Sequence, residues 1–238
     1  MEIMMKNIHS RHERGNSVGF LKLPLIFTDP KLWAGAIGQF YVLTKTLEDI
    51  EGGEMLQFVR RSLSHKPLAQ GYASDLQQLL GTGWESEVMA TMQTDATREY
   101  VEKMKRADDC SLCSAVFILY GALMIGGGKA TQRKVKKIPA LRHCDHVLFD
   151  VEMSAKARFR STFDALAEKW PGEIDKLAQE ARNWMDMNNK VVISVKCTPW
   201  WAYHAVTAAV GLAGVAGYFW LKGRGEGRVG HGLMVLNK

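Results

Sequence analysis

The stretch from Leu119 to Lys137 reads LYGALMIGGGKATQRKVKK and places three consecutive glycines, Gly126 to Gly128, between an apolar run and a basic run. Both flanks have helical spacing, although each glycine costs a helix about 0.5–1 kcal/mol relative to alanine. Glycines allow a helix to bend and its backbone to approach a flat ligand closely. The spacing fits a hinge or a close crossing of two core helices equally well.

Most of the remaining chain has apolar residues three and four positions apart, the spacing of amphipathic helices. No alternating strand pattern stands out except the short run Val191 to Val195, which continues a helix more naturally. The pattern predicts one all-α domain over residues 1–195. The expected helices are 32–50, 68–80, 97–105, 110–137, 154–169 and 173–195.

The segment 200–221, WWAYHAVTAAVGLAGVAGYFWL, has 22 residues without a formal charge and aromatic residues at both ends. Its length and aromatic belts predict a transmembrane anchor, with 196–199 as linker and 222–238 as a polar tail; the alternative is an apolar core helix. The small residues Ala205, Ala209, Ala213 and Gly217 recur every four positions, which is weak evidence for self-association through this helix. We expect a tail-anchored protein facing the cytosol, in the endoplasmic reticulum or the mitochondrial outer membrane.

The composition favours a domain with a packed core and gives no evidence of nucleic-acid binding. Of 238 residues, 47% are hydrophobic and 24% charged, which excludes wholesale disorder. The net charge of +6 is spread among nearly as many acids, so we expect no nucleic-acid partner. Cys110 and Cys113 lack a second pair at zinc-site spacing, and the quartet His143 to His146 is interpreted as a polar loop, although its residue types could ligate a metal.

The motifs of several enzyme classes are absent from the sequence, which contains no GxSxG, P-loop or HExxH. A helix weakened by glycines could instead lie against a planar cofactor such as haem, which needs an imidazole ligand and cations for its propionates. His12 could supply the imidazole. Lys156 and Arg160, at positions i and i+4, could supply the cations. Each also has a simpler explanation as a surface residue.

The order of these pieces resembles the haem oxygenase family over most of the 1–195 domain. HERGNSVGF, from His12 to Phe20, resembles the family's proximal stretch, and GGGKATQRKVKK occupies the place of its distal Ser-Gly-Gly-Gln motif. Further segments match in order, from the acidic end of the 32–50 helix to the last helix over the pocket. They are QFYVLTKTLEDI, ASDLQQLLGTGWES, TREYVEKM, FRSTFDAL and QEARNWMDMNN.

The resemblance implies that haem is both substrate and cofactor and is cleaved with O₂ to biliverdin, carbon monoxide and ferrous iron. His12 would be the axial ligand of the haem iron, Gly127 and Gly128 would press against the ring as catalytic backbone, and Lys156 and Arg160 would bind propionates. Electrons would come from NADPH through a membrane-bound cytochrome reductase. The basic residues Arg133, Lys134, Lys136 and Lys137 suit an acidic docking face on that reductase.

Several pocket positions depart from the family pattern. Gly126 stands in place of the motif serine and Lys129 in place of its glutamine, while Met124 stands in place of the distal aspartate. Ile118 replaces a distal tyrosine, and His9 replaces a lysine three residues before the ligand. Met124 motivates a second hypothesis, a haem-binding or haem-sensing membrane protein without turnover. A membrane-tethered interaction module that binds no haem is the third.

Overall fold

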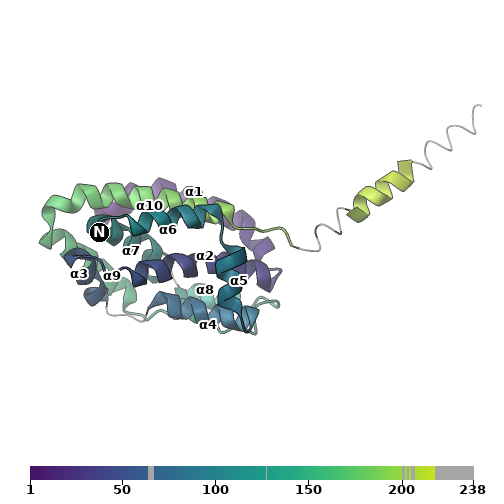
Figure 1. Ribbon diagram of the computed structural model, residues 1–238, viewed down its shortest axis with the longest axis horizontal. Helices are drawn as coiled ribbons and strands as arrows, with labels where there is room; N and C mark the ends of the chain where they lie inside the picture. Colours follow the sequence, from purple (N-terminus) through teal and green to yellow (C-terminus); the bar gives the residue numbers. More distant parts are fainter. Residues whose placement is uncertain (64–66, 127, 200–201, 203, 205–206, 218–238) are drawn as a thin grey trace, which may run out of the picture. The chain divides into compact units, whose positions relative to one another are not determined.

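The chain divides into two units, Met1–Cys197 and Thr198–Lys238, which are described separately. The computed structural model describes residues 1–63, 67–126, 128–199, 202, 204 and 207–217 (Figure 1). Gly127, most of the aromatic ends of the predicted anchor, its Ala205 and the predicted tail 222–238 lie outside the described residues.

All regular structure in the described part of the chain is helical, so the prediction of an all-α fold is confirmed. The expected helices match observed ones to within a few residues, except that the region 110–137 is divided in two. The longer elements are α1 (Glu2–Ile26), α2 (Pro30–Asp49), α3 (Glu54–Leu63), α4 (Leu68–Leu80), α6 (Asp95–Lys105), α7 (Asp109–Met124), α8 (Gly128–Val135), α9 (Ala155–Lys169) and α10 (Ile174–Ser194). The short ones are α5 (Trp84–Glu87), the π-helical turn η1 (Val88–Met92), and the 3₁₀ turns η2 (Val147–Phe149) and η3 (Pro171–Glu173).

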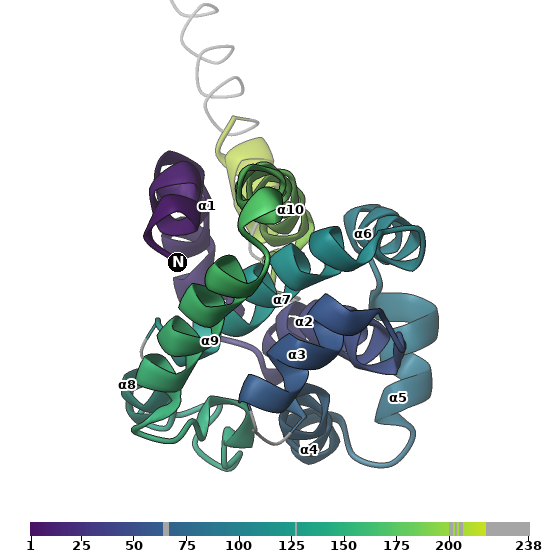
Figure 2. The same ribbon diagram turned by 90° about the vertical axis from the view of Figure 1, so that its left-hand side faces the viewer.

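Helix α7 forms the centre of the first unit. It packs against α10, α3, α2 and α9, and Figure 2 shows it surrounded by these helices. Every residue from Cys110 to Tyr120 is buried, as expected for a helix with apolar residues on all sides. Its N-terminus is capped by Asp108, whose carboxylate accepts a hydrogen bond of 2.9 Å from the amide of Ser111.

Gly126 lies just after α7 and Gly128 begins α8, and the two helices are bent by 53°. A Cβ atom at Gly126 would lie 2.2 Å from the carbonyl oxygen of Ala122, so no other residue fits there without a backbone shift. A Cβ atom at Gly128 would lie 3.1 Å from the carbonyl oxygen of Phe149. The glycines therefore serve a sharp turn and a close backbone contact, and the expected continuous helix is broken for these reasons.

Carboxylates in three helices cap the N-termini of other helices. Asp109 in α7 accepts a hydrogen bond of 2.7 Å from the amide of Met55 in the first turn of α3. Glu48 in α2 accepts one of 2.7 Å from the amide of Leu68 at the start of α4. Asp75 in α4 does the same for η2. Since the first amides of a helix lack intrahelical partners, these bonds stabilise each short element while fixing its direction.

The second unit contains an apolar helix, Thr207–Gly217. In the described ranges, no single helix combines the length and hydrophobicity needed to cross a bilayer; α7 and α8 pass that test only as a bent pair. The predicted anchor 200–221 extends beyond the described helix at both ends. It therefore stays a prediction.

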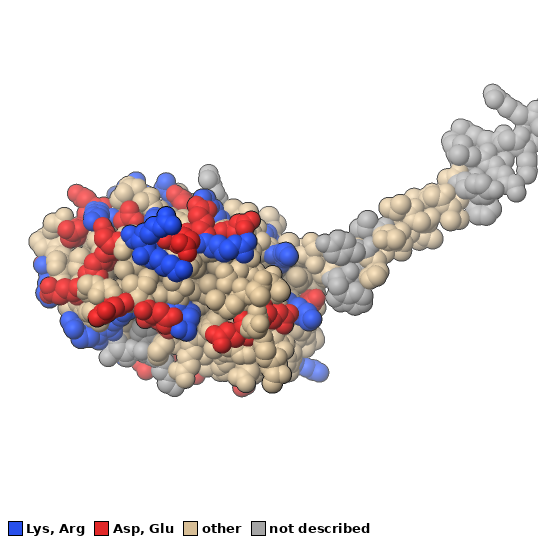
Figure 3. Space-filling model, viewed as in Figure 1, with Lys and Arg blue, Asp and Glu red and all other residues tan. Residues whose placement is uncertain are grey.

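Charged side chains of both signs are mixed on the face of the first unit shown in Figure 3, without a large area of one sign. Exposed ion pairs such as Lys190 with Glu99, 3.0 Å apart, join neighbouring helices of this unit. This distribution resembles an ordinary solvated surface.

Candidate functional site

A cleft of about 630 Å³ opens in the first unit. Its walls come from α1, α2, Tyr72 of α4, the C-terminal half of α7, the start of α8, η2 and α10, and most of the lining side chains are apolar. Ligand pockets typically have about 300–1,000 Å³, so this cleft has room for a small organic ligand. It is the principal candidate site.

Two histidines of α1 line the cleft, His9 and His12. They are three positions apart and so lie on one face of the helix. The Nε2 atom of His9 lies 3.2 Å from a carboxylate oxygen of Glu13 on the surface. Both imidazoles are exposed, so an external ligand has access to them.

Side chains on both sides of the interface fasten α1 to α10. Arg11 Nε donates to both carboxylate oxygens of Asp186, each at 2.9 Å. Asn189 Nδ2 donates to the carbonyl oxygen of Arg11 at 2.8 Å. Near the other end, the Lys22 ammonium donates to the carbonyl oxygen of Val195 at 2.8 Å, at the end of α10. These bonds lie before and after His12 along α1 and hold this part of the helix against α10.

Small residues of α7 and of the turn after it form part of the facing wall. Gly121, Ala122 and Gly126 all line the cleft, with Ile125 between them. Short side chains leave the backbone open to close approach by a flat ligand. This wall can therefore accept a planar molecule against the helix.

The cleft is poor in acids: among the described residues that line it, none is aspartate or glutamate. Its charged or titratable groups are His9, His12, Lys22 and Tyr72. Burial, the largest effect, raises the pKa of Tyr72, so this phenol is neutral at ordinary pH. The lining residues that the structure describes can offer imidazole nitrogens but no carboxylate to a ligand.

The predicted propionate partners lie elsewhere. Lys156 and Arg160 are exposed on α9, and neither lines the cleft. Helix α9 buries Phe159, Phe163 and other residues against its neighbours, and Lys156 and Arg160 each follow a buried residue by one position. A single position turns a helix by about 100°, which directs both side chains to the flank of α9.

The predicted distal residues are only partly brought together. Gly126 and Ile118 line the cleft. Met124 and Gly128 are buried without lining it, and Gly127 lies outside the described residues. Lys129 is exposed and forms an ion pair with Asp150. The position that resembles the family's acid therefore points into the core, and Ala122 occupies the wall.

The sequence reasoning missed the walls formed by α2 and η2. Trp33, Ile37 and Phe40 line the cleft from α2, and Phe149 lines it from η2. The rings of Trp33 and Phe149 stack with centroids 6.3 Å apart. The spacing 33, 37 and 40 marks one helix face, a signal that could have identified the α2 wall. Phe149 carried no comparable signal.

Several solved structures with a similar fold are described as heme oxygenases. Heme oxygenase 2 from Chlamydomonas reinhardtii, solved without heme, has a TM-score of 0.67 and 22% identity, over 83% of this chain and 97% of that one. Heme oxygenase-1 from the cyanobacterium Synechocystis, in complex with heme, has a TM-score of 0.61 and 17% identity, over 90% and 97%. Heme oxygenase-2 from Synechocystis, with heme and NO, has a TM-score of 0.58 and 16% identity, over 82% and 85%.

No protein-family model and no curated protein sequence matches the chain. The likeness therefore lies in the arrangement of the helices, at identities that have little bearing on activity. It extends over nearly the whole of the first two similar structures. The chain has the fold of the haem oxygenases.

Proposed function

We propose that this protein binds haem in the cleft and cleaves it oxidatively, giving biliverdin, carbon monoxide and ferrous iron. The observation that carries the proposal is the position of His12, on an apolar cleft and within a haem oxygenase fold. Haem is the substrate and, when bound, supplies the iron chemistry that activates O₂. NADPH is the proposed source of electrons, through a partner cytochrome reductase.

The cleft residues fit haem in three respects. His12 offers an imidazole nitrogen, the ligand that haem iron commonly takes from proteins. Apolar side chains such as Ile37 and Phe117 would cover the ring and exclude water. Gly126 and Ala122 leave room for the ring next to the α7 backbone.

The roles of the chain's own residues follow from these positions. The bonds of Arg11 and Lys22 to α10 would hold α1, and therefore His12, in a fixed place. Lys156 and Arg160 are the proposed propionate partners. Because they do not line the cleft, their long, exposed side chains would have to turn toward its rim.

A second candidate function, haem binding or sensing without turnover, is favoured by one observation. No carboxylate lines the cleft in the described part of the chain, and Met124 is buried away from it. General acid catalysis needs a positioned proton donor or an ordered water held by one. A cleft without such an acid could retain haem without transferring protons efficiently.

One experiment separates these functions. The purified protein is titrated with haem while the Soret band is followed, and NADPH with a cytochrome reductase is then added. If the protein cleaves haem, the Soret band should shift on haem addition and biliverdin should appear after the reductase is added. A shift without biliverdin supports the haem-binding alternative, and the absence of any shift contradicts both.

The ligand is tested with a matched pair of variants on the same helix face. His12→Ala should remove the histidine-ligated spectrum, whereas His9→Ala should keep it, although both residues line the cleft. Loss of that spectrum in His9→Ala alone would assign the iron to His9 instead.

We further propose that 200–221 anchors the protein in the endoplasmic reticulum or mitochondrial outer membrane, with the first unit in the cytosol. The uncharged sequence and the apolar helix Thr207–Gly217 support this proposal. Fractionation of cells that express the full chain, compared with a chain ending at residue 199, tests it: only the full chain should sediment with membranes. Equal distribution of the two would contradict it.

A further inference from the structure

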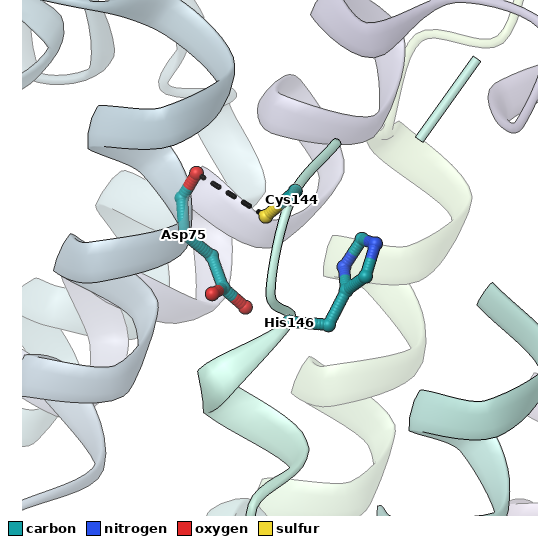
Figure 4. A group of neighbouring side chains, drawn as sticks. All are labelled: Asp75, Cys144 and His146. Carbon is teal, nitrogen blue, oxygen red and sulfur yellow. Dashed lines mark hydrogen bonds between the residues drawn. The ribbon is translucent and has the colours of Figure 1, made fainter. Parts of the chain in front are cut away.

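Three side chains that can ligate metals meet in the core, and none of the three is among the described residues that line the cleft. Asp75 comes from α4, while Cys144 and His146 come from the turn before η2 (Figure 4). The side chains of Asp75 and His146 are 0% exposed and that of Cys144 is 1% exposed. One ligand atom from each lies within 4.8 Å of the other two.

The imidazole of His146 is oriented as in a metal site. Its Nε2 atom lies 3.0 Å from the carbonyl oxygen of Leu141, a contact that assigns the proton to Nε2. Its Nδ1 atom is buried and has no hydrogen-bond partner among the residues that the structure describes. In Figure 4 this nitrogen faces the side of Cys144 and Asp75. Histidines that bind metals usually donate their other ring N–H to a carbonyl or carboxylate, which is the arrangement found here.

The carboxylate of Asp75 is also held in place, by hydrogen bonds from backbone amides. Its two carboxylate oxygens accept hydrogen bonds from the amides of Val147, at 2.6 Å, and Leu148, at 3.2 Å. A carboxylate oxygen has two lone pairs, so one remains on each atom for a further ligand. The Sγ atom of Cys144 lies 3.9 Å from the carbonyl oxygen of Asp75, next to the carboxylate.

We propose that Asp75, Cys144 and His146 bind one zinc ion. Thiolate sulfur, imidazole nitrogen and carboxylate oxygen are the ligands that zinc takes in proteins, and three of them leave one tetrahedral position for water. The two charges of Zn²⁺ balance one thiolate and one carboxylate, so the loaded site is neutral in the core. On binding, the Cys144 thiol proton leaves to solvent and the sulfur–zinc bond replaces the sulfur–hydrogen bond.

The cluster must contract slightly on binding. Zinc–sulfur and zinc–nitrogen bonds of about 2.3 and 2.0 Å place tetrahedral ligands roughly 3.5 Å apart. Burial raises the pKa of Cys144 to about 12 and that of Asp75 to about 6, and lowers the pKa of His146. Without a cation the thiol therefore stays protonated, and a bound cation would reverse this.

Zinc at this position would stabilise the wall of the cleft that η2 forms. Leu148 and Phe149 line the cleft, and only Val147 separates them from His146 in the sequence. Gly71 of α4 allows the backbone of this turn to approach, since a Cβ atom there would lie 3.0 Å from the Cα atom of Leu148. The metal would join α4 to η2 by bonds far stronger than these packing contacts.

The test uses the full chain without a purification tag, equilibrated with zinc and then freed of excess by dialysis. Metal analysis should give about one zinc ion per chain. Cys144→Ala and His146→Ala should lose it, whereas His143→Ala and Cys197→Ser should keep it, because these two residues lie outside the cluster. His12→Ala should also keep its zinc, so the outcome is independent of haem binding.

Substitution in the core can prevent folding, and two further measurements address that case. The conservative variant Asp75→Asn keeps an acceptor oxygen for one of the two η2 amides and should bind zinc at least tenfold more weakly. Cobalt added to the wild-type chain should give a thiolate-to-metal absorption band, and zinc should raise its melting temperature while a chelator reverses the rise. A wild-type chain that takes up no zinc, or zinc that persists in Cys144→Ala, overturns the proposal.

Discussion

Arg11 donates its Nε hydrogen to both carboxylate oxygens of Asp186, each at 2.9 Å, and thereby joins α1 to α10 next to His12. The two side chains are 40% and 51% exposed, so their effect on global stability is small. The pair matters because it holds α1 in register with α10, and any shift of α1 along α10 also moves the imidazole of His12.

Arg11→Ala should therefore weaken haem binding as well as lower the free energy of unfolding slightly. An exposed ion pair contributes about 0.2–1 kcal/mol, which corresponds to a loss of up to about fivefold in affinity. Haem titration and urea unfolding of the same samples measure both effects. Lys45→Ala, which removes the exposed pair with Asp49 on α2, is the matched control and should leave haem affinity unchanged. Equal affinities in all three proteins would contradict the role given to Arg11.

Gly126→Ala should destabilise the first unit, because the new Cβ atom would collide with the carbonyl oxygen of Ala122 at 2.2 Å. Relief requires a shift of the turn between α7 and α8, at a cost of about 1–3 kcal/mol. Gly172→Ala is the control, since nothing lies within 4 Å of a Cβ atom there. Urea unfolding compares the two variants. A neutral Gly126→Ala would mean that the turn adapts freely.

An acid introduced into the cleft tests whether the absence of a carboxylate from its described lining limits haem cleavage. Ala122 lines the cleft, whereas Met124 is buried at 6% exposure. Ala122→Asp should increase the biliverdin formed per bound haem, because its carboxylate could orient water near the ligand. Met124→Asp should lower the free energy of unfolding by several kcal/mol, because it buries an unpaired charge. An Ala122→Asp variant that binds haem with unchanged turnover would rule out the missing carboxylate as the limiting factor.

The cap of α7 should give a measurable pH dependence. The hydrogen bond from Lys176, 2.7 Å long, lowers the pKa of Asp108 below its usual 3.8, and the amide of Ser111 adds to this. Since the folded pKa is depressed, the ionised group stabilises the protein above pH 4, and this contribution is lost as the pH falls through the folded pKa.

Asp108→Asn should accordingly lower the free energy of unfolding by about 0.5–1 kcal/mol at pH 7, and the difference from wild type should shrink below pH 4. Denaturant unfolding at a series of pH values measures the difference, with the exposed Glu168→Gln as a charge-matched control. A difference that stays constant down to pH 3 would exclude the ion pair as its source.

The helical fold could be predicted from the local spacing of apolar residues. The errors in the predicted helices also have local causes. The helix expected over 110–137 breaks because Gly126 fits only a sharp turn. Helix α1 was not foreseen although it extends over 25 residues, since it includes Pro24 and two glycines. Packing against α10 stabilises it despite these residues.

The sequence could predict residues of the candidate site only where a single segment identified them without a distant partner. His12 lines the cleft as the resemblance implied, and its role as iron ligand stays a prediction. For Lys156 and Arg160, the spacing correctly placed both on one helix face but could not say toward which neighbour that face turns. Asp75 and His146 lie close together in the core although they are 71 positions apart in the sequence. The sequence around residues 143–146 carries no sign of this distant partner, so the interpretation of the segment as a polar loop missed the burial of Cys144 and His146.

The caps supplied by Asp109, Glu48 and Asp75 have a consequence for folding cooperativity. Each carboxylate belongs to one helix and holds the first amides of another, so α3, α4 and η2 cannot fray one at a time without breaking a bond to α7, α2 or α4. Amide hydrogens in these elements should therefore exchange with solvent together, at rates set by opening of the whole bundle. The helices of the first unit would then melt as one cooperative body.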